Sequence, residues 1–101
     1  MSKYPNDETI DKMEEVLNVA SDYTRLKIMY ALIDGEKSVS EIVEIVGASQ
    51  SLASHQLSVL KKAFLVATRK EATRIYYRLS DHHVIELLNV IHEHVLEGKE
   101  E

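Results

Sequence analysis

The sequence predicts a mostly helical domain with one β-hairpin, namely a winged helix-turn-helix, and three observations predict it. Two short amphipathic segments are joined by a glycine-containing turn, as in a helix-turn-helix. After Phe64 the apolar residues change from helical spacing to the β-rich pattern of a hairpin. The length of 101 residues suits a single domain over residues 1–101. A domain this small buries only part of its apolar surface, so we also expect a homodimer.

The first two helices are indicated by apolar residues at helical intervals. The first is expected to begin at Asp7 or Thr9, because short polar side chains accept hydrogen bonds from the free amides of a helix start. The second is expected to begin at Ser21 or Asp22 and to end at Gly35. The apolar positions are Ile10, Met13, Val16, Leu17 and Ala20 in the first helix and Leu26, Ile28, Met29, Leu32 and Ile33 in the second.

The helix-turn-helix is expected in the stretch SVSEIVEIVGASQSLASHQLSVLKKA. Its first helix would begin at Ser38 or Ser40 and end at Gly47. Its second helix, the recognition helix, is expected over about residues 49–62.

The wing is expected over residues 64–79, where LVATRK and TRIYYRL are rich in β-branched and aromatic residues. Glu71 and Ala72 would lie near its tip. The last helix, over about residues 81–97, carries both the expected dimer contact and a candidate metal site.

Charge is distributed unevenly along the chain. Residues 50–79 contain six bases and one acid, for a formal charge of +5, whereas the rest contains six bases and sixteen acids, for −10. A basic segment on an acidic body is typical of a surface that binds nucleic acid. An ordinary solvated face is the alternative.

Composition argues against several other classes of protein. The chain has no cysteine, which excludes disulfides, thiolate metal sites and thiol catalysis. No apolar stretch approaches the roughly 20 residues of a membrane span, and the N-terminal MSKYPNDETI lacks the apolar core of a signal peptide. We therefore expect a cytoplasmic protein without a membrane partner.

The recognition helix has a face of small polar side chains that suits double-stranded DNA. Short hydroxyl side chains allow a helix to approach the base edges in a major groove about 12 Å wide. Gln50 can contact adenine, and serine and histidine can reach base edges or phosphates. The base-contacting candidates are Gln50, Ser51, Ser54 and His55, and the phosphate-contacting candidates are Lys61, Lys62, Arg69, Lys70 and Arg74. A polar surface without a partner is the alternative for the serines and His55.

The last helix carries possible metal ligands at both ends of one face. His83 and His94 are separated by eleven residues, or roughly 16 Å along a helix, so one helix cannot bring both to one ion. Two copies packed antiparallel across a two-fold axis can do so. The numbers of His83 and His94 sum to 177 and those of Asp81 and Glu97 to 178, so both pairs imply one register. We expect two equivalent sites per dimer, each with Asp81 and His83 from one subunit and His94 and Glu97 from the other.

These segments together resemble the ArsR/SmtB family of bacterial metal-responsive repressors, from about Asp11 to Glu97. The most specific stretches are SQSLASHQLSVLKKAFLV and RIYYRL. The resemblance implies that the recognition helix reads operator DNA. It also implies a zinc-sensing site from DHH at 81–83 and HVLE at 94–97, and control of metal efflux genes or of the chain's own operon. One departure is the wing tip, where KEAT stands in place of the common glycine.

Two imidazoles and two carboxylates suit tetrahedral Zn(II), with Co(II) or Ni(II) as alternatives. Metal binding is expected to release the operator by changing the geometry of the paired helices. In relatives the second ring nitrogen of a metal-bound histidine bonds a backbone carbonyl near the end of the recognition helix. By position His94 would donate to a carbonyl close to Phe64. For His82 and His92 we expect solvent-exposed side chains, with His82 as an alternative donor.

Three other functions remain open at this point. The chain could be a repressor of the same fold that responds to no metal, a dimerisation protein that zinc only staples, or a metallohydrolase. A four-ligand site leaves no open metal position, and the sequence has no H-E-x-x-H motif, so we expect no enzyme.

Overall fold

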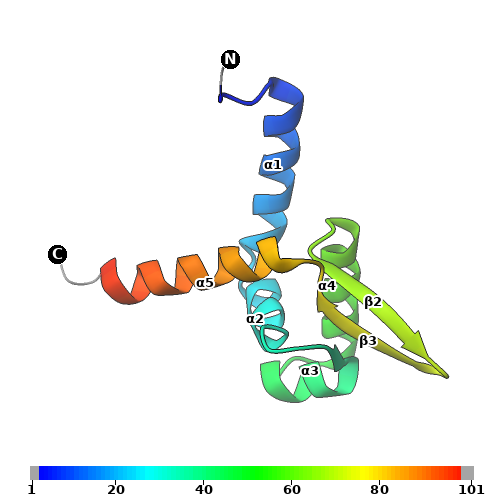
Figure 1. Ribbon diagram of the computed structural model, residues 1–101. Coiled ribbons are helices and arrows are strands. Elements are labelled where there is room, and N and C mark those ends of the chain that lie inside the picture. Colours follow the sequence, from blue (N-terminus) through cyan, green and yellow to red (C-terminus); the bar gives the residue numbers. More distant parts are fainter. Residues whose placement is uncertain (1–2, 99–101) are drawn as a thin grey trace.

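The computed structural model describes residues 3–98, and Figure 1 shows how its elements are arranged. The fold is a winged helix-turn-helix, mostly helical with a three-stranded antiparallel sheet, which confirms the predicted class. Among residues 3–98 no helix is both long and apolar enough to cross a bilayer. The elements are α1 (Asp7–Ala20), α2 (Tyr23–Ala31), β1 (Lys37–Ser38), α3 (Val39–Val46), α4 (Gln50–Lys62), β2 (Val66–Glu71), β3 (Arg74–Leu79) and α5 (His82–Glu97).

The helix starts follow the capping rules, with one correction. The residue that caps α1 is Asn6, whose side chain accepts from the Thr9 amide at 2.8 Å, so the expected caps Asp7 and Thr9 are wrong. Both of these residues lie inside the helix because Asn6 is the first side chain in position to accept that amide. Asp22 caps α2 as predicted, accepting from the Arg25 amide at 3.0 Å.

The first helix of the helix-turn-helix is closed at both ends by local bonds. Ser38 and Glu41 form a capping box, in which the Ser38 hydroxyl accepts the Glu41 amide and the Glu41 carboxylate accepts the Ser38 amide. The Ser38 bonds hold the pKa of the Glu41 carboxyl below its ordinary value. At the other end Gly47 has φ 80, the left-handed conformation that glycine favours. The predicted limits of this helix are therefore confirmed.

The predicted end of α2 at Gly35 is wrong, since the helix ends at Ala31. The Leu32 and Ile33 amides bond to Met29 and Tyr30 carbonyls three residues back, so a tighter turn ends the helix early. Gly35 lies in the loop beyond this turn with φ 145, a conformation that side chains disfavour.

The wing is a hairpin extended by a short third strand, in the order β1-β3-β2. β2 and β3 pair from Val66 opposite Leu79 to Glu71 opposite Arg74, so the tip is the two-residue loop 72–73. Ala72 has φ 57 and takes the left-handed position at the glycine-free tip. β1 was not predicted because a two-residue strand has too few positions to show an alternating pattern.

The core lies between the helix-turn-helix, the base of the wing and the first half of α5. Its fully buried side chains include Ile28, Met29, Leu32, Ile42, Leu57 and Leu60. The Arg25 side chain ties three helices together, because its Nε donates to the Val19 carbonyl at 2.8 Å and its Nη1 to Gln56 Oε1 at 2.7 Å. This places α4 against α1 and α2, independently of any partner.

The helices α1 and α5 project from this core in different directions (Figure 1). The radius of gyration is 15.1 Å, above the about 13 Å typical of a compact chain of this length. None of the residues Asp7–Ala20 of α1 is buried, and in α5 only Val84 and Leu88 are. Ile91 and Val95 are 46% and 49% exposed because the second half of α5 extends beyond the core.

Candidate nucleic-acid interface and metal centre

The recognition helix α4 is held by one face and leaves the predicted polar face free. Its N-terminus is capped by Ser49, whose Oγ accepts the Leu52 amide at 3.1 Å. Ala53, Leu57 and Leu60 are fully buried against the core. Leu52, an apolar residue of the same helix, is 41% exposed. The helix is therefore fixed in orientation by apolar packing over about two turns.

The opposite side of α4 carries the residues predicted to contact bases. Gln50, Ser51, Ser54 and His55 are all exposed, and Ser58 extends the same face. All of them are short or medium-length side chains on a well-anchored helix. This arrangement lets the backbone of α4 come close to a flat or grooved partner surface.

A shallow groove separates α4 from the wing and was not predicted from the sequence. Ser54 of α4 lines it together with the start of α3 and residues of β3 and the tip, among them Ser40, Thr73 and Tyr76. These residues come from three segments far apart in the sequence. Their hydroxyl groups add hydrogen-bonding capacity beside the predicted contact face.

The bases predicted to contact phosphates divide into two sets. Lys61 and Lys62 lie in the last turn of α4, where the helix dipole also favours positive charge. In the wing, cross-strand partners share a face and neighbours along a strand alternate. Arg69 and Arg74 therefore lie on one face and Lys70 on the other. A DNA duplex could contact all three of these side chains only if the wing tip inserted into one of the grooves of the DNA.

Arg69 differs from the other bases because it is already paired. Its Nε lies 3.1 Å from Glu36 Oε2 and its Nη1 2.7 Å from Glu71 Oε1, while the guanidinium lies 4.8 Å from the centre of the Tyr76 ring. The bonds from Arg69 hold the pKa of the Glu36 carboxyl below its ordinary value, and those carboxylates raise the pKa of Arg69. Among residues 3–98, Lys61, Lys62, Lys70 and Arg74 form no ion pair within 4 Å.

The first pair of predicted metal ligands stands at the start of α5. Asp81 is the N-cap, and its Oδ1 accepts the His83 and Val84 amides at 2.9 and 3.3 Å. His83 is 77% exposed, with Nδ1 3.5 Å from the same carboxylate oxygen. The two side chains are therefore close together and open to a partner, although one Asp81 oxygen is engaged by the helix.

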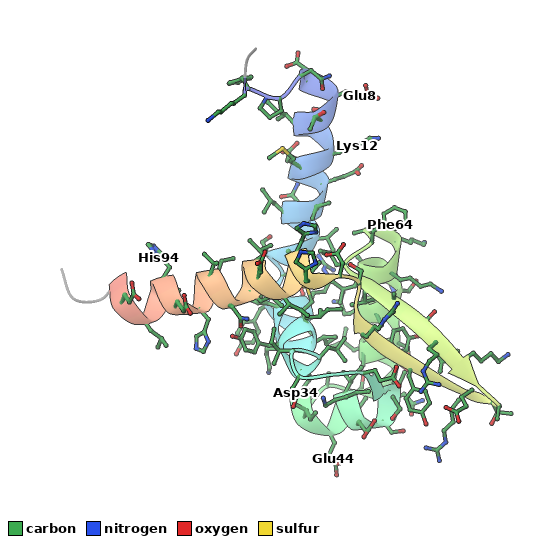
Figure 2. The ribbon with its side chains drawn as sticks, in the orientation of Figure 1. Glu8, Lys12, Asp34, Glu44, Phe64 and His94 are labelled. Atoms are coloured by element: carbon green, nitrogen blue, oxygen red, sulfur yellow. The ribbon has the colours of Figure 1, made fainter. Side chains whose placement is uncertain are left out.

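The second pair, His94 and Glu97, lies at the far end of α5. Both are exposed, and Figure 2 shows His94 on the part of the helix that extends beyond the core. Within the described residues of one chain, no three His, Cys, Asp or Glu side chains cluster closely enough to hold a metal. The separation agrees with the helical arithmetic, so the four side chains can meet only between two chains.

The other two histidines of α5 have partners of their own. The His82 ring lies 4.2 Å from the His83 ring, centre to centre. His92 is exposed as expected, but its Nδ1 lies 2.8 Å from the Tyr30 hydroxyl and the two rings meet edge to face. This contact links α5 to α2, and the sequence pattern did not predict it.

The junction between α4 and α5 is tightly bonded. The Ser80 hydroxyl donates to the Phe64 carbonyl at 2.7 Å, and the Ser80 amide donates to the Leu65 carbonyl at 3.1 Å. Phe64 itself has φ 62 and an 83% exposed side chain. In one chain His94 and Phe64 lie on opposite sides of the molecule (Figure 2), so the expected bond from His94 to a carbonyl near Phe64 would have to cross a dimer interface.

Comparison with known proteins agrees with this architecture. The profile of bacterial regulatory proteins of the arsR family matches residues 22–68, which cover α2 to the first half of β2. The chain belongs to the arsR family. The members of this family are transcriptional regulators and not enzymes, which confirms the expectation that the chain is not an enzyme.

Individual arsR-family relatives match most of the chain. The HTH-type transcriptional regulator KmtR of Mycobacterium tuberculosis is 38% identical over 82 residues, and a transcriptional repressor SmtB homolog of Synechocystis is 34% identical over 87. These matches cover 81% and 86% of this chain but only 63% and 66% of the relatives.

A solved structure shows the same fold along almost all of its length. The homodimeric winged helix-turn-helix DNA-binding domain of a possible ArsR-family regulator from Mycobacterium bovis superposes with a TM-score of 0.81 at 29% identity. The superposition covers 100% of this chain and 98% of that domain.

Proposed function

We propose that this chain is a DNA-binding transcriptional repressor that acts as a homodimer in the cytoplasm and releases its operator when it binds Zn(II). The observation that carries DNA binding is the exposed polar face of α4 beside a basic wing. One of its relatives is named a transcriptional repressor, which supports repression as the direction of regulation. Gln50, Ser51, Ser54 and His55 would contact base edges, while Lys61, Lys62, Lys70 and Arg74, with Arg69 once its carboxylates release it, would contact phosphates.

The proposed dimer is supported by the apolar surface that α1 and α5 leave uncovered. Met13 and Leu17 of α1 are about half exposed, as are Val90 and Val95 of α5. Burial of such side chains is the main favourable contribution to association. The homodimeric relative of the same fold supports a two-fold partner here.

The proposed metal site is supported by the ligand positions on α5. In an antiparallel pair of α5 helices, Asp81 and His83 of one subunit would face His94 and Glu97 of its partner. Two imidazoles and two carboxylates fit the donors that Zn(II) takes in tetrahedral sites, so the residues present fit the ion. When bound, the cation would supply a cross-link between subunits. Co(II) fits the same donors, and Ni(II) would require further ligands such as His82.

Coupling between the two sites is supported by the bonds around Ser80. They attach the start of α5 to the end of α4, so a change in the angle of α5 would be passed to the recognition helix. The two helices of a dimer must fit operator half-sites about one helical turn apart, and a small rotation would disturb that spacing. The coupling must be reciprocal, with DNA weakening metal binding by the same factor.

The test is DNA binding with and without metal. We expect Zn(II) to weaken binding of the dimer to a duplex from its own promoter region by about five- to 150-fold, measured by fluorescence anisotropy. His94→Gln should abolish this effect and leave binding without metal intact. His92→Gln removes a histidine of the same helix that is outside the proposed ligand set, and it should keep the response.

Other outcomes would favour the alternatives. Release by zinc that survives His94→Gln would contradict the proposed site. DNA binding that no metal alters would favour a metal-independent repressor, whereas zinc that tightens the dimer without altering DNA affinity would favour a structural staple. A parallel titration with Co(II) and Ni(II) identifies the preferred cation.

A further inference from the structure

Arg69 is the wing base whose charge is shared with two carboxylates of its own chain. The side chain starts on β2, passes over the Tyr76 ring of β3 and reaches Glu36 in the loop before β1. Glu71, two residues further along β2, bonds the same guanidinium at 2.7 Å. The cluster therefore connects the wing to the helix-turn-helix body through one cation.

We propose that Glu36 and Glu71 act as internal competitors of DNA phosphate for Arg69 and so set the affinity of the wing for DNA. The inference rests on the proposed DNA binding but not on the metal site. Both carboxylates are anions within hydrogen-bonding distance of a base that faces the expected phosphate surface. A phosphate can bind Arg69 fully only by displacing them.

The exposure of the cluster makes such an exchange possible. The side chains of Arg69 and Glu36 are 47% and 35% exposed, and that of Glu71 is 68% exposed. Ion pairs as open to water as these are weak and easily exchanged. A phosphate of a duplex can therefore take Arg69 without unfolding any element of the wing.

The consequence is a lower affinity for DNA of any sequence. After Arg69 moves to a phosphate, the two carboxylates stay near the duplex and repel it. Contacts to phosphate carry no sequence information, so this effect weakens non-specific and specific binding alike. Glu36 and Glu71 therefore set how tightly the wing holds DNA and leave the ratio of specific to non-specific affinity to the base contacts expected from α4.

The experiment replaces each carboxylate by its neutral amide in the full chain. Glu36→Gln, Glu71→Gln and the double variant are titrated without metal against a short fluorescein-labelled duplex of random sequence over a series of NaCl concentrations. Glu8→Gln is the matched control for each single variant, because it makes the same change of one charge at the start of α1, far from the wing (Figure 2). Arg69→Gln provides the background in which the competition is absent.

We expect the double variant to bind about three- to tenfold more tightly than the unmodified chain, and Glu8→Gln to change the affinity much less. The slope of log K against log[NaCl] should become steeper by about one, as for one additional phosphate contact. In the Arg69→Gln background most of the gain should vanish. Variants that bind no better than Glu8→Gln, or more weakly, would refute the inference. Absence of binding by the unmodified chain would instead refute the proposed function and this inference with it.

Discussion

The helix-turn-helix and the two outer helices are stabilised in different ways. In α4, Ala53, Leu57 and Leu60 are fully buried by other elements of the same chain. In α1 no residue is buried, and the buried residues of α5, Val84 and Leu88, both lie in its first half. The recognition helix is thus packed fully by its own chain, whereas the outer helices leave apolar side chains exposed that a partner could cover.

This difference indicates a division of roles within a chain of 101 residues. A contact face for DNA must keep its shape before it meets the partner, so it is packed against the core. Under the proposed function α5 must be able to change its angle when metal binds, which suits a helix whose buried residues lie only in its first half. The bonds of Ser80 connect the two regions at the point where α5 begins.

The largest effect on the free energy of unfolding is expected from a substitution in the buried face of α4. Leu57→Ala removes a fully buried side chain and should lower the free energy of unfolding by about 3 kcal/mol, because a cavity remains in the core. Leu52→Ala is the same substitution on the same helix at a 41% exposed position and should lower it by about 1 kcal/mol or less. Urea denaturation at one protein concentration measures both. Equal losses would contradict the assignment of the two faces of α4.

A smaller effect is expected from a substitution in the outer helices, and it should alter dimer association instead of folding. Val90→Glu places a charge on the proposed α5 interface and should raise the dimer dissociation constant at least about tenfold, equivalent to 1.4 kcal/mol. Ile45→Glu alters an equally accessible apolar side chain on α3 and should leave the dimer intact. Analytical ultracentrifugation distinguishes the two. Dissociation by both variants, or by neither, would place the interface elsewhere.

Asp81 allows the structural and metal roles of the start of α5 to be separated. Asp81→Ala removes the helix cap and should lower the free energy of unfolding by about 1 kcal/mol. Asp81→Ser keeps a capping oxygen and should unfold almost like the unmodified chain, yet bind Zn(II) more weakly because it lacks the carboxylate. Denaturation and zinc competition with a chelating dye measure the two properties. Unchanged zinc affinity in Asp81→Ser would remove Asp81 from the ligand set.

The smallest effect is expected at the wing tip. Ala72 has φ 57, which is unfavourable for a residue with a side chain, so Ala72→Gly should stabilise the fold by about 0.5 kcal/mol after the greater freedom of glycine in the unfolded chain is counted. Thr73→Gly, at the neighbouring tip position without positive φ, should destabilise. Thermal denaturation compares the pair, and the reverse order would contradict the left-handed conformation at position 72.

The sequence by itself determined the order of the five helices and the hairpin, most helix limits and the polar face of α4. These features depend on periodicity and capping, which are set by residues close together in the sequence. The capping box of Ser38 and Glu41 and the left-handed Gly47 are examples. The separation of His83 from His94 was also calculable, because a helix has a fixed rise per residue.

Only the tertiary structure decided which apolar and charged residues find partners. It paired Arg69 with Glu36 across 33 positions and His92 with Tyr30 across 62, and it left Ile91 and Val95 outside the core. Such contacts depend on where distant segments meet, and one-dimensional spacing contains no information on that. The strand β1 belongs to the same class, since it exists only through its pairing with β3.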